Sequence, residues 1–176
     1  MNKADEKPGD QVFTQRWVAE FILDLIHYKP ELDLSKSSIL EPACGDGAFL
    51  EVIITRLIQS ATLYDKDAKD LINSIRAYDL LKENTEKTKA LAKRLLSHSA
   101  FSDSADQLVD NWIEQKDFLA DKAKNQYDFV VGNPPYTRLE DVGEAKSKKY
   151  RNNFPTMKGR ADLYIGFFEK GLLSLN

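Results

Sequence analysis

The residues best suited to chemistry are Gly132-Asn133-Pro134-Pro135-Tyr136. The two prolines restrict the backbone, so that the Asn133 side-chain oxygen and a neighbouring carbonyl, that of Pro134, would point at one spot as hydrogen-bond acceptors. Such a pair suits an NH2 group, and it would draw an exocyclic amine of a base toward a tetrahedral form with its lone pair exposed. Tyr136 offers a flat face for a base rotated out of a duplex. We therefore predict that Asn133, Pro134, Pro135 and Tyr136 are catalytic residues for attack by an amine nitrogen.

A second candidate site is the turn Glu41-Pro42-Ala43-Cys44-Gly45-Asp46-Gly47, in which two glycines let a ligand approach the backbone. It lacks the third glycine of a dinucleotide-binding fingerprint and the lysine of a phosphate loop, and Glu41 would repel a pyrophosphate. S-adenosylmethionine fits better, because its ammonium and sulfonium groups would be attracted to Glu41 and its carboxylate could meet backbone amides. An ordinary structural turn is the alternative interpretation of the glycines.

An acid, Asp79, ends an apolar segment about 30 residues beyond the glycine turn, where a carboxylate commonly accepts the hydroxyls of a ribose. That spacing exceeds the usual ~20 residues. A solvated aspartate is the alternative if Asp79 is considered alone.

Alternating strand and helix patterns would position these groups. Thr14 is placed to cap a first helix that ends near Pro30, and later helices are indicated by Phe49 to Ile58, Thr85 to Leu96, and Leu108, Trp112 and Ile113. Strands are indicated at Ser38 to Glu41, Ser74 to Asp79 and Tyr127 to Val131, with a strand end near Lys116 to Leu119. This alternation predicts an α/β fold with a mostly parallel sheet, covered on both faces, whose ligands lie at the carboxyl ends of the strands.

The two ends of the chain lead to further expectations. Residues 1–10 indicate a disordered lead, and residues 11–176 a single catalytic domain. The segment Ala161 to Leu173 has the apolar density of a buried helix. No further strand is expected after it, so we expect the sheet to be incomplete at its C-terminal side.

In content and order, these motifs resemble the amino-group methyltransferases that carry Asn-Pro-Pro-Tyr, in particular the adenine-N6 DNA methyltransferases of restriction-modification systems. The resemblance runs across nearly the whole chain and implies a Rossmann-like, S-adenosylmethionine-dependent methyltransferase fold. It also implies a set of cofactor-binding residues: Thr14 in a segment before the turn; Glu41, Ala43, Cys44, Gly45 and Gly47 in the turn; Asp79 at the ribose; and Asp117 and Phe118 near the adenine ring. The family usually has Thr-Pro where this chain has Thr14-Gln15.

The motif order resembles the gamma arrangement, in which a target-recognition domain follows the catalytic domain. The resemblance therefore implies that these residues are an N-terminal catalytic part without its recognition domain, and that residues 1–176 alone methylate nothing. Two other functions stay open. Glutamine-N5 protein methyltransferases and some ribosomal RNA methyltransferases share the motif, and the chain could also be a catalytically silent cofactor-binding module.

The net charge and composition limit which kinds of partner the chain can bind. A net charge of −3 and a pI near 5.5 do not suit a free-standing nucleic-acid binder, so affinity for double-stranded DNA would have to be local. The loop from Arg138 to Arg160 is basic and follows the catalytic motif, although it could equally be a solvated, mobile loop. The exposed sheet edge could allow self-association.

The cysteine, the histidines and the hydropathy pattern predict neither a metal site nor a membrane-spanning segment. The single cysteine, Cys44, and the widely separated His27 and His98 predict no metal site, and Cys44 is assigned no nucleophilic role. Trp17 and Trp112 are interpreted as structural. With neither a signal peptide nor a membrane span apparent, we expect a cytoplasmic protein.

Overall fold

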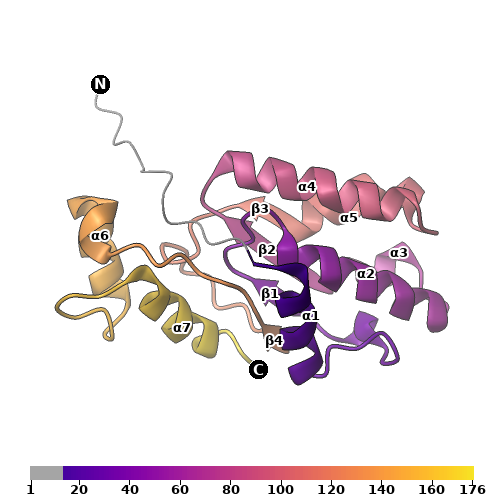
Figure 1. The fold of residues 1–176 in the computed structure, drawn as a ribbon, viewed down its shortest axis with the longest axis horizontal. Coiled ribbons are helices and arrows are strands. Elements are labelled where there is room, and N and C mark those ends of the chain that lie inside the picture. Colours follow the sequence, from indigo (N-terminus) through magenta and orange to yellow (C-terminus); the bar gives the residue numbers. More distant parts are fainter. Residues whose placement is uncertain (1–13) are drawn as a thin grey trace.

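The computed structural model describes residues 14–176, so the predicted disordered lead, residues 1–10, lies outside the described residues. Helices and strands alternate along the described chain (Figure 1). They are α1 (Arg16–Leu25), β1 (Ile39–Glu41), α2 (Ala48–Leu63), α3 (Ala68–Leu71), β2 (Ile75–Asp79), α4 (Lys82–Ser97), α5 (Ala105–Trp112), β3 (Ile113–Gln115), β4 (Phe129–Val130), α6 (Glu144–Asn153) and α7 (Leu163–Leu173). Short 3-10 helices cover Leu34–Lys36, Ser102–Ser104 and Leu139–Val142.

The strands form one parallel sheet in the order β3-β2-β1-β4. Ile39 of β1 pairs with Ile75 of β2 on one side and with Phe129 of β4 on the other, while β3 extends the sheet beyond β2. Because the strands are parallel, their carboxyl ends meet at one edge, which carries Glu41 and Asp79. The predicted α/β fold with a parallel sheet is confirmed.

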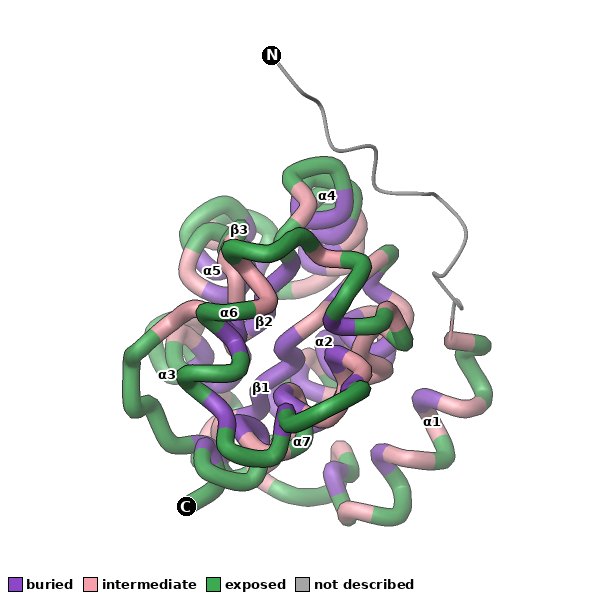
Figure 2. The backbone as a smooth tube through the Cα atoms, turned by 90° about the vertical axis from the view of Figure 1, so that its left-hand side faces the viewer, coloured by how far each residue is buried: buried purple, intermediate pink, exposed green. Residues whose placement is uncertain are grey.

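Both faces of the sheet are covered by helices. Neighbouring residues of a strand point to opposite faces, so each strand contributes side chains to both layers. Ile39 enters a cluster that contains buried residues of α1, α2, α4 and α5. The next residue, Leu40, enters a second cluster formed with Tyr78, Phe118 and residues around α6 and α7. Figure 2 shows β1 and β2 buried between these layers, with exposed residues on the outer turns of the helices and in the connecting loops.

Three local features differ from what the sequence predicted. Thr14 does not cap α1, whose N-cap is Gln15 without a side-chain hydrogen bond. Ile113 begins β3 rather than ending a helix, because pairing with Ala77 in the sheet outweighs the local helical spacing. The segment from Arg138 to Arg160 is not simply a loop, since it contains the 3-10 helix and α6.

The helix predicted to be buried, α7, is buried on one side only. Leu163, Gly166, Lys170 and Gly171 form its buried side. A Cβ built on Gly171 would lie 3.4 Å from Cγ1 of Val130, which places this side against β4. On the opposite side Phe168, Leu172 and Leu173 are 65–72% exposed. Beyond α7, Leu175 forms a single parallel bridge with Tyr127.

Candidate active site

The glycine turn is held from two sides by backbone hydrogen bonds. The Cys44 amide donates to the carbonyl of Tyr78 at 2.8 Å, and the Gly45 carbonyl accepts from the hydroxyl of Thr88 in α4 at 3.0 Å. Gly45 and Gly47 have φ angles of 52° and 88°, which favour glycine. A Cβ on Gly47 would also lie 2.8 Å from a methyl group of Leu91, so a side chain at this position would require the Leu91 side chain to move.

Asp79 connects this turn to the start of α4. Its carboxylate accepts hydrogen bonds from the Gly45 amide at 2.9 Å, the Leu81 amide at 2.8 Å and the Asn84 side chain at 3.1 Å. A carboxylate has about four acceptor positions, so these three donors leave about one acceptor position for a ligand. Asp79 therefore shapes the turn itself, a role that the sequence analysis missed because Asn84 and Thr88 lie in an ordinary polar helix. Its contact with a ribose stays a prediction.

Glu41 is a buried acid with unused hydrogen-bonding capacity. Its side chain is almost fully buried, and its Oε2 atom has no hydrogen-bond partner among the described residues. Burial raises the pKa of Glu41 well above its ordinary value, and the nearby Asp46 and Asp79 raise it further. A cationic group beside Glu41 would satisfy this oxygen and favour the ionised form. Burial also raises the pKa of the Cys44 thiol, which opposes formation of a nucleophilic thiolate.

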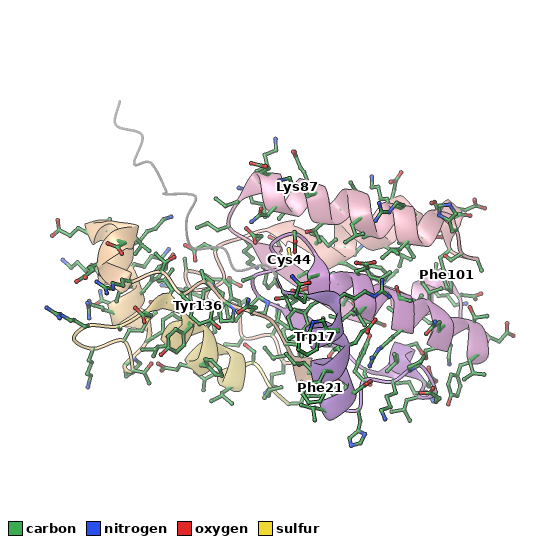
Figure 3. All side chains as sticks on the ribbon, in the orientation of Figure 1. Trp17, Phe21, Cys44, Lys87, Phe101 and Tyr136 are labelled. Carbon is green, nitrogen blue, oxygen red and sulfur yellow. The ribbon has the colours of Figure 1, made fainter. Side chains whose placement is uncertain are left out.

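The Asn-Pro-Pro-Tyr motif lies at the same edge of the sheet as the glycine turn. The Val131 amide donates to the carbonyl of Leu40 at 2.9 Å, which continues the pairing of β4 with β1. A Cβ on Gly132 would lie 3.5 Å from Cδ of Pro42 and 3.7 Å from Cγ of Glu41. Asn133 directly follows this contact. In Figure 3, Tyr136 lies on the α7 side of Cys44.

The residues after the motif are tied to the start of α7. The Leu139 amide donates to Ala161 at 2.8 Å, and the Leu163 amide donates to Thr137 at 2.9 Å, so that Arg138 and Asp162 form an antiparallel bridge. The ring of Tyr136, which is 56% exposed, lies 5.9 Å from that of Tyr164 in α7. Tyr164 therefore supports Tyr136, a role that was not predicted for it from the sequence.

Comparison with known proteins connects this arrangement to a family. Residues 34–176 match the model of the Eco57I restriction-modification methylase family. The chain belongs to this family. It is 39% identical over 169 residues to the type II methyltransferase M.PaeR7I of Pseudomonas aeruginosa, covering 94% of this chain and 29% of that protein. It is also 39% identical over 166 residues to M.XhoI of Xanthomonas vasicola, covering 92% of this chain and 30% of that protein. The chain thus spans about 30% of the length of these relatives.

Solved structures show that this chain of the Eco57I family shares its fold with methyltransferases. A Listeria monocytogenes protein assigned to the class I S-adenosylmethionine-dependent methyltransferases matches with a TM-score of 0.60 at 19% identity, over 96% of this chain and 46% of that protein. The M protein of the type I restriction enzyme EcoKI matches with a TM-score of 0.52 at 18% identity, over 72% of this chain and 25% of that protein. The Rossmann-like methyltransferase fold is thereby confirmed.

The segment that contains Thr14 lies beside the start of α2. The Arg16 guanidinium donates to Glu51, in the first turn of α2, at 2.7 Å. Gln15, where the resemblance led us to expect proline, has φ −68° and ψ 141°, a conformation that proline also adopts. The backbone at Gln15 is therefore one that the family's proline would also fit. Cofactor contact by Thr14 stays a prediction.

Asp117 and Phe118 lie next to the site, but their side chains have other partners. The Lys116 amide donates to the carbonyl of Asp79 at 2.8 Å, which brings this segment to the carboxyl edge of the sheet. Asp117 accepts hydrogen bonds from the Tyr150 hydroxyl at 2.8 Å and the Ala120 amide at 3.0 Å. The buried Phe118 ring stacks with Tyr78 and Phe167. Their predicted contact with an adenine ring is not tested by this geometry.

The other residues considered in the sequence have varied surroundings. Trp112 is buried and donates to the carbonyl of Leu71 at 2.9 Å, as expected of a structural residue. Trp17 is instead 67% exposed. Among residues 14–176 no group of three or more His, Cys, Asp or Glu side chains is arranged to hold a metal ion. Every described helix is too short or too polar to cross a bilayer.

Proposed function

We propose that this chain is the cofactor-binding and catalytic part of an adenine-specific DNA methyltransferase of a restriction-modification system. It would promote transfer of a methyl group from S-adenosylmethionine to the N6 amine of an adenine flipped out of duplex DNA. One observation carries the proposal. The packing of Gly132 against Glu41 and Pro42 brings the glycine turn and Asn133 to one edge of the parallel sheet.

The turn has the chemistry that a cationic, phosphate-free cofactor requires. S-adenosylmethionine would supply an electrophilic methyl group on its sulfonium. The unpartnered Glu41 oxygen would accept a hydrogen bond from the cofactor's ammonium group. The Ala48 amide donates to Asp46, but the N-cap residue Gly47 makes no side-chain hydrogen bond, so the next amides at the start of α2 could receive its carboxylate. We propose that Thr14, Ala43, Cys44, Gly45, Gly47, Asp79, Asp117 and Phe118 line the rest of this site.

On the other side of the edge, the motif would hold the adenine amine. Asn133 and the Pro134 carbonyl would accept its two hydrogens and orient the nitrogen lone pair toward the methyl carbon. Pro135 would keep the loop rigid, so little reorganisation is needed at the moment of reaction. Tyr136, supported by Tyr164, would stack on the flipped base.

Relatives named as type II methyltransferases favour DNA over a protein or ribosomal RNA substrate. The test uses the full-length protein with labelled S-adenosylmethionine and offers duplex DNA, ribosomal RNA and a release factor in parallel. We expect label in DNA, and N6-methyladenine after digestion to nucleosides. N4-methylcytosine would overturn the adenine assignment. Labelled release factor or RNA with unlabelled DNA would overturn the choice of substrate, and cofactor binding without any methylation would support the silent module.

We also propose that residues 1–176 alone bind cofactor weakly and do not methylate DNA. The exposed Phe168, Leu172 and Leu173 of α7 form an apolar surface next to the site, and an uncovered surface of this kind favours association or local opening. Robust turnover by this segment alone would contradict this part of the proposal.

A further inference from the structure

The positive charge of the chain is concentrated directly after the catalytic motif. Residues 138–160 contain seven basic and three acidic side chains, a local charge of +4 in a chain whose net charge is −3. The basic residues are Arg138, Lys146, Lys148, Lys149, Arg151, Lys158 and Arg160. In Figure 1 this segment includes α6 and forms one end of the molecule, away from the distal end of α4. A local excess of this kind attracts an anionic partner even when the whole protein is acidic.

Three of these residues line one pocket of about 250 Å³, together with Glu140, Ala161 and Asp162. Arg151 donates to the carbonyls of Met157 and Gly159, both at 2.8 Å, and so fixes the turn that carries Arg160. Arg138 makes only a long, exposed ion pair with Glu140, at 3.7 Å. Neither Arg138 nor Arg160 therefore has its hydrogen-bonding capacity filled by the described residues.

The pocket has a fixed position relative to the catalytic motif. Arg138 follows Tyr136 by two residues, and the bridge with Asp162 holds Arg138 in extended backbone. Side chains two apart in extended backbone lie on the same side, roughly 7 Å from each other. That separation is within reach of the backbone phosphates that flank a base stacked on Tyr136. Arg160 approaches from the other strand of the same bridge, two residues before Asp162.

We propose that the pocket formed by Arg138, Arg151 and Arg160 binds one backbone phosphate of the DNA strand that carries the target base. Arg138 and Arg160 would donate to the phosphate oxygens, since a guanidinium matches this geometry with two parallel hydrogen bonds. Arg151 is a positioning residue that holds the Arg160 turn. Glu140 and Asp162 would orient the guanidinium groups in the absence of DNA. The inference rests on the proposed function and adds the contact that would fix the position of the flipped nucleotide.

The test compares four variants of the full-length protein: Arg138→Gln, Arg160→Gln, Arg160→Lys and Arg94→Gln. Arg94 is an exposed arginine near the end of α4, so its variant has the same charge change at a remote site. Binding to duplex DNA is measured by fluorescence anisotropy over a range of salt concentrations. Each phosphate near the methylated base is also replaced in turn by an uncharged methylphosphonate. Melting temperature and cofactor affinity, measured for every variant, establish that each one is folded.

We expect Arg138→Gln and Arg160→Gln each to raise the Kd for DNA about 3- to 10-fold, and to lower the slope of log K against log salt by about 1. Arg160→Lys should recover most of the slope, because it keeps the charge, while Arg94→Gln should match the wild type. One methylphosphonate position should weaken the wild type and have no further effect on Arg160→Gln. The pocket assignment is overturned if the wild type methylates DNA but both pocket variants behave like Arg94→Gln. Failure of the wild type to methylate DNA would instead overturn the proposed function.

Discussion

The glycine turn and the Asn-Pro-Pro-Tyr loop meet at one edge of the sheet but are stabilised in different ways. The turn is largely buried, and its amides donate hydrogen bonds to Tyr78 and Asp79 while its Gly45 carbonyl accepts one from Thr88. The loop begins after β4, whose two residues are only partly buried, its aromatic residue is more than half exposed, and one antiparallel bridge ties the following residues to α7. A cofactor of constant shape suits the first arrangement, and a base that must enter from a duplex suits the second.

This contrast predicts that substitutions in the turn and in the loop affect different measured quantities. Changes in the turn should alter cofactor affinity and the stability of the fold together, since the same hydrogen bonds serve both. Changes in the loop should alter methyl transfer or DNA binding and leave cofactor affinity almost unchanged. Four sets of variants of the full-length protein test this separation.

The largest effect is expected for Asn133→Ala. Loss of one of the two acceptors should lower kcat for methyl transfer at least about 100-fold, because the amine is no longer held in its reactive form. Cofactor affinity, measured by calorimetric titration, should stay within about twofold of the wild type, since Asn133 belongs to the loop. Gly45→Val is the matched change in the turn, where a β-branched residue is strained at a φ of 52°. It should weaken cofactor binding first, and a reversed pattern would show that the two sites were misassigned.

A smaller effect is expected for Glu41→Gln, which should raise the Kd for S-adenosylmethionine about 10- to 100-fold through loss of a hydrogen bond to a charged group. Because burial raises the pKa of Glu41, cofactor binding to the wild type should release a proton. The calorimetric enthalpy should then vary with the ionisation enthalpy of the buffer for the wild type and not for the variant. An enthalpy independent of buffer in both proteins would exclude Glu41 as the group that receives the cation.

The same pKa shift has a defined effect on stability. The folded state holds the Glu41 proton more tightly than the unfolded chain, whose carboxyl has a pKa of about 4.3. The free energy of unfolding should therefore fall as the pH rises above that value, toward the higher pKa of the folded state. Denaturant titrations of the cofactor-free protein should show this decline in the wild type and a flatter dependence in Glu41→Gln. Equal slopes would mean that Glu41 is not protonated in the fold.

Tyr136→Ala should act only on DNA binding. Loss of one base-stacking contact should raise KM for DNA about 5- to 100-fold. Tyr136→Phe, which keeps the aromatic face, is the control and should retain most of the affinity. Tyr164→Ala should also raise KM for DNA, but by a smaller factor, since Tyr164 only supports the Tyr136 ring. A fall in cofactor affinity in these variants would break the separation between loop and turn.

The smallest effect is expected for Arg16→Ala. It removes an exposed ion pair with Glu51, and pairs of this kind contribute at most about 1 kcal/mol. If this pair holds the Thr14 segment over the turn, the Kd for cofactor should rise about two- to fivefold, and the difference should shrink at high salt. Arg94→Gln again serves as the control. Identical cofactor affinity in both variants would remove Thr14 from the cofactor site.

The sequence alone was sufficient for the features that depend on local patterns. Apolar runs that end in Glu41, Asp79 and Gly132 indicated parallel strands, and two short motifs indicated an edge where a cofactor and an amine would meet. It was insufficient where distant residues decide the local conformation. Ile113 continues a helical pattern, yet pairing with Ala77 makes it a strand residue. The α7 sequence is apolar apart from Glu169 and Lys170, yet only one side of α7 packs against β4 and Met157.

The same limit applies to the site. Amino-acid type and spacing were enough to propose Glu41 and Asn133 as site residues, because an acid beside a glycine turn and an amide between a strand and two prolines are informative in themselves. Only the tertiary structure showed that Asp79 is occupied by the Gly45 and Leu81 amides, and that Arg138, Arg151 and Arg160 line one pocket. The hydrogen bond of the Gly45 amide to Asp79 and the cluster of three arginines join residues that are separated in the chain by 9 to 34 positions. Their partners are therefore fixed by packing and leave no periodic trace in the sequence.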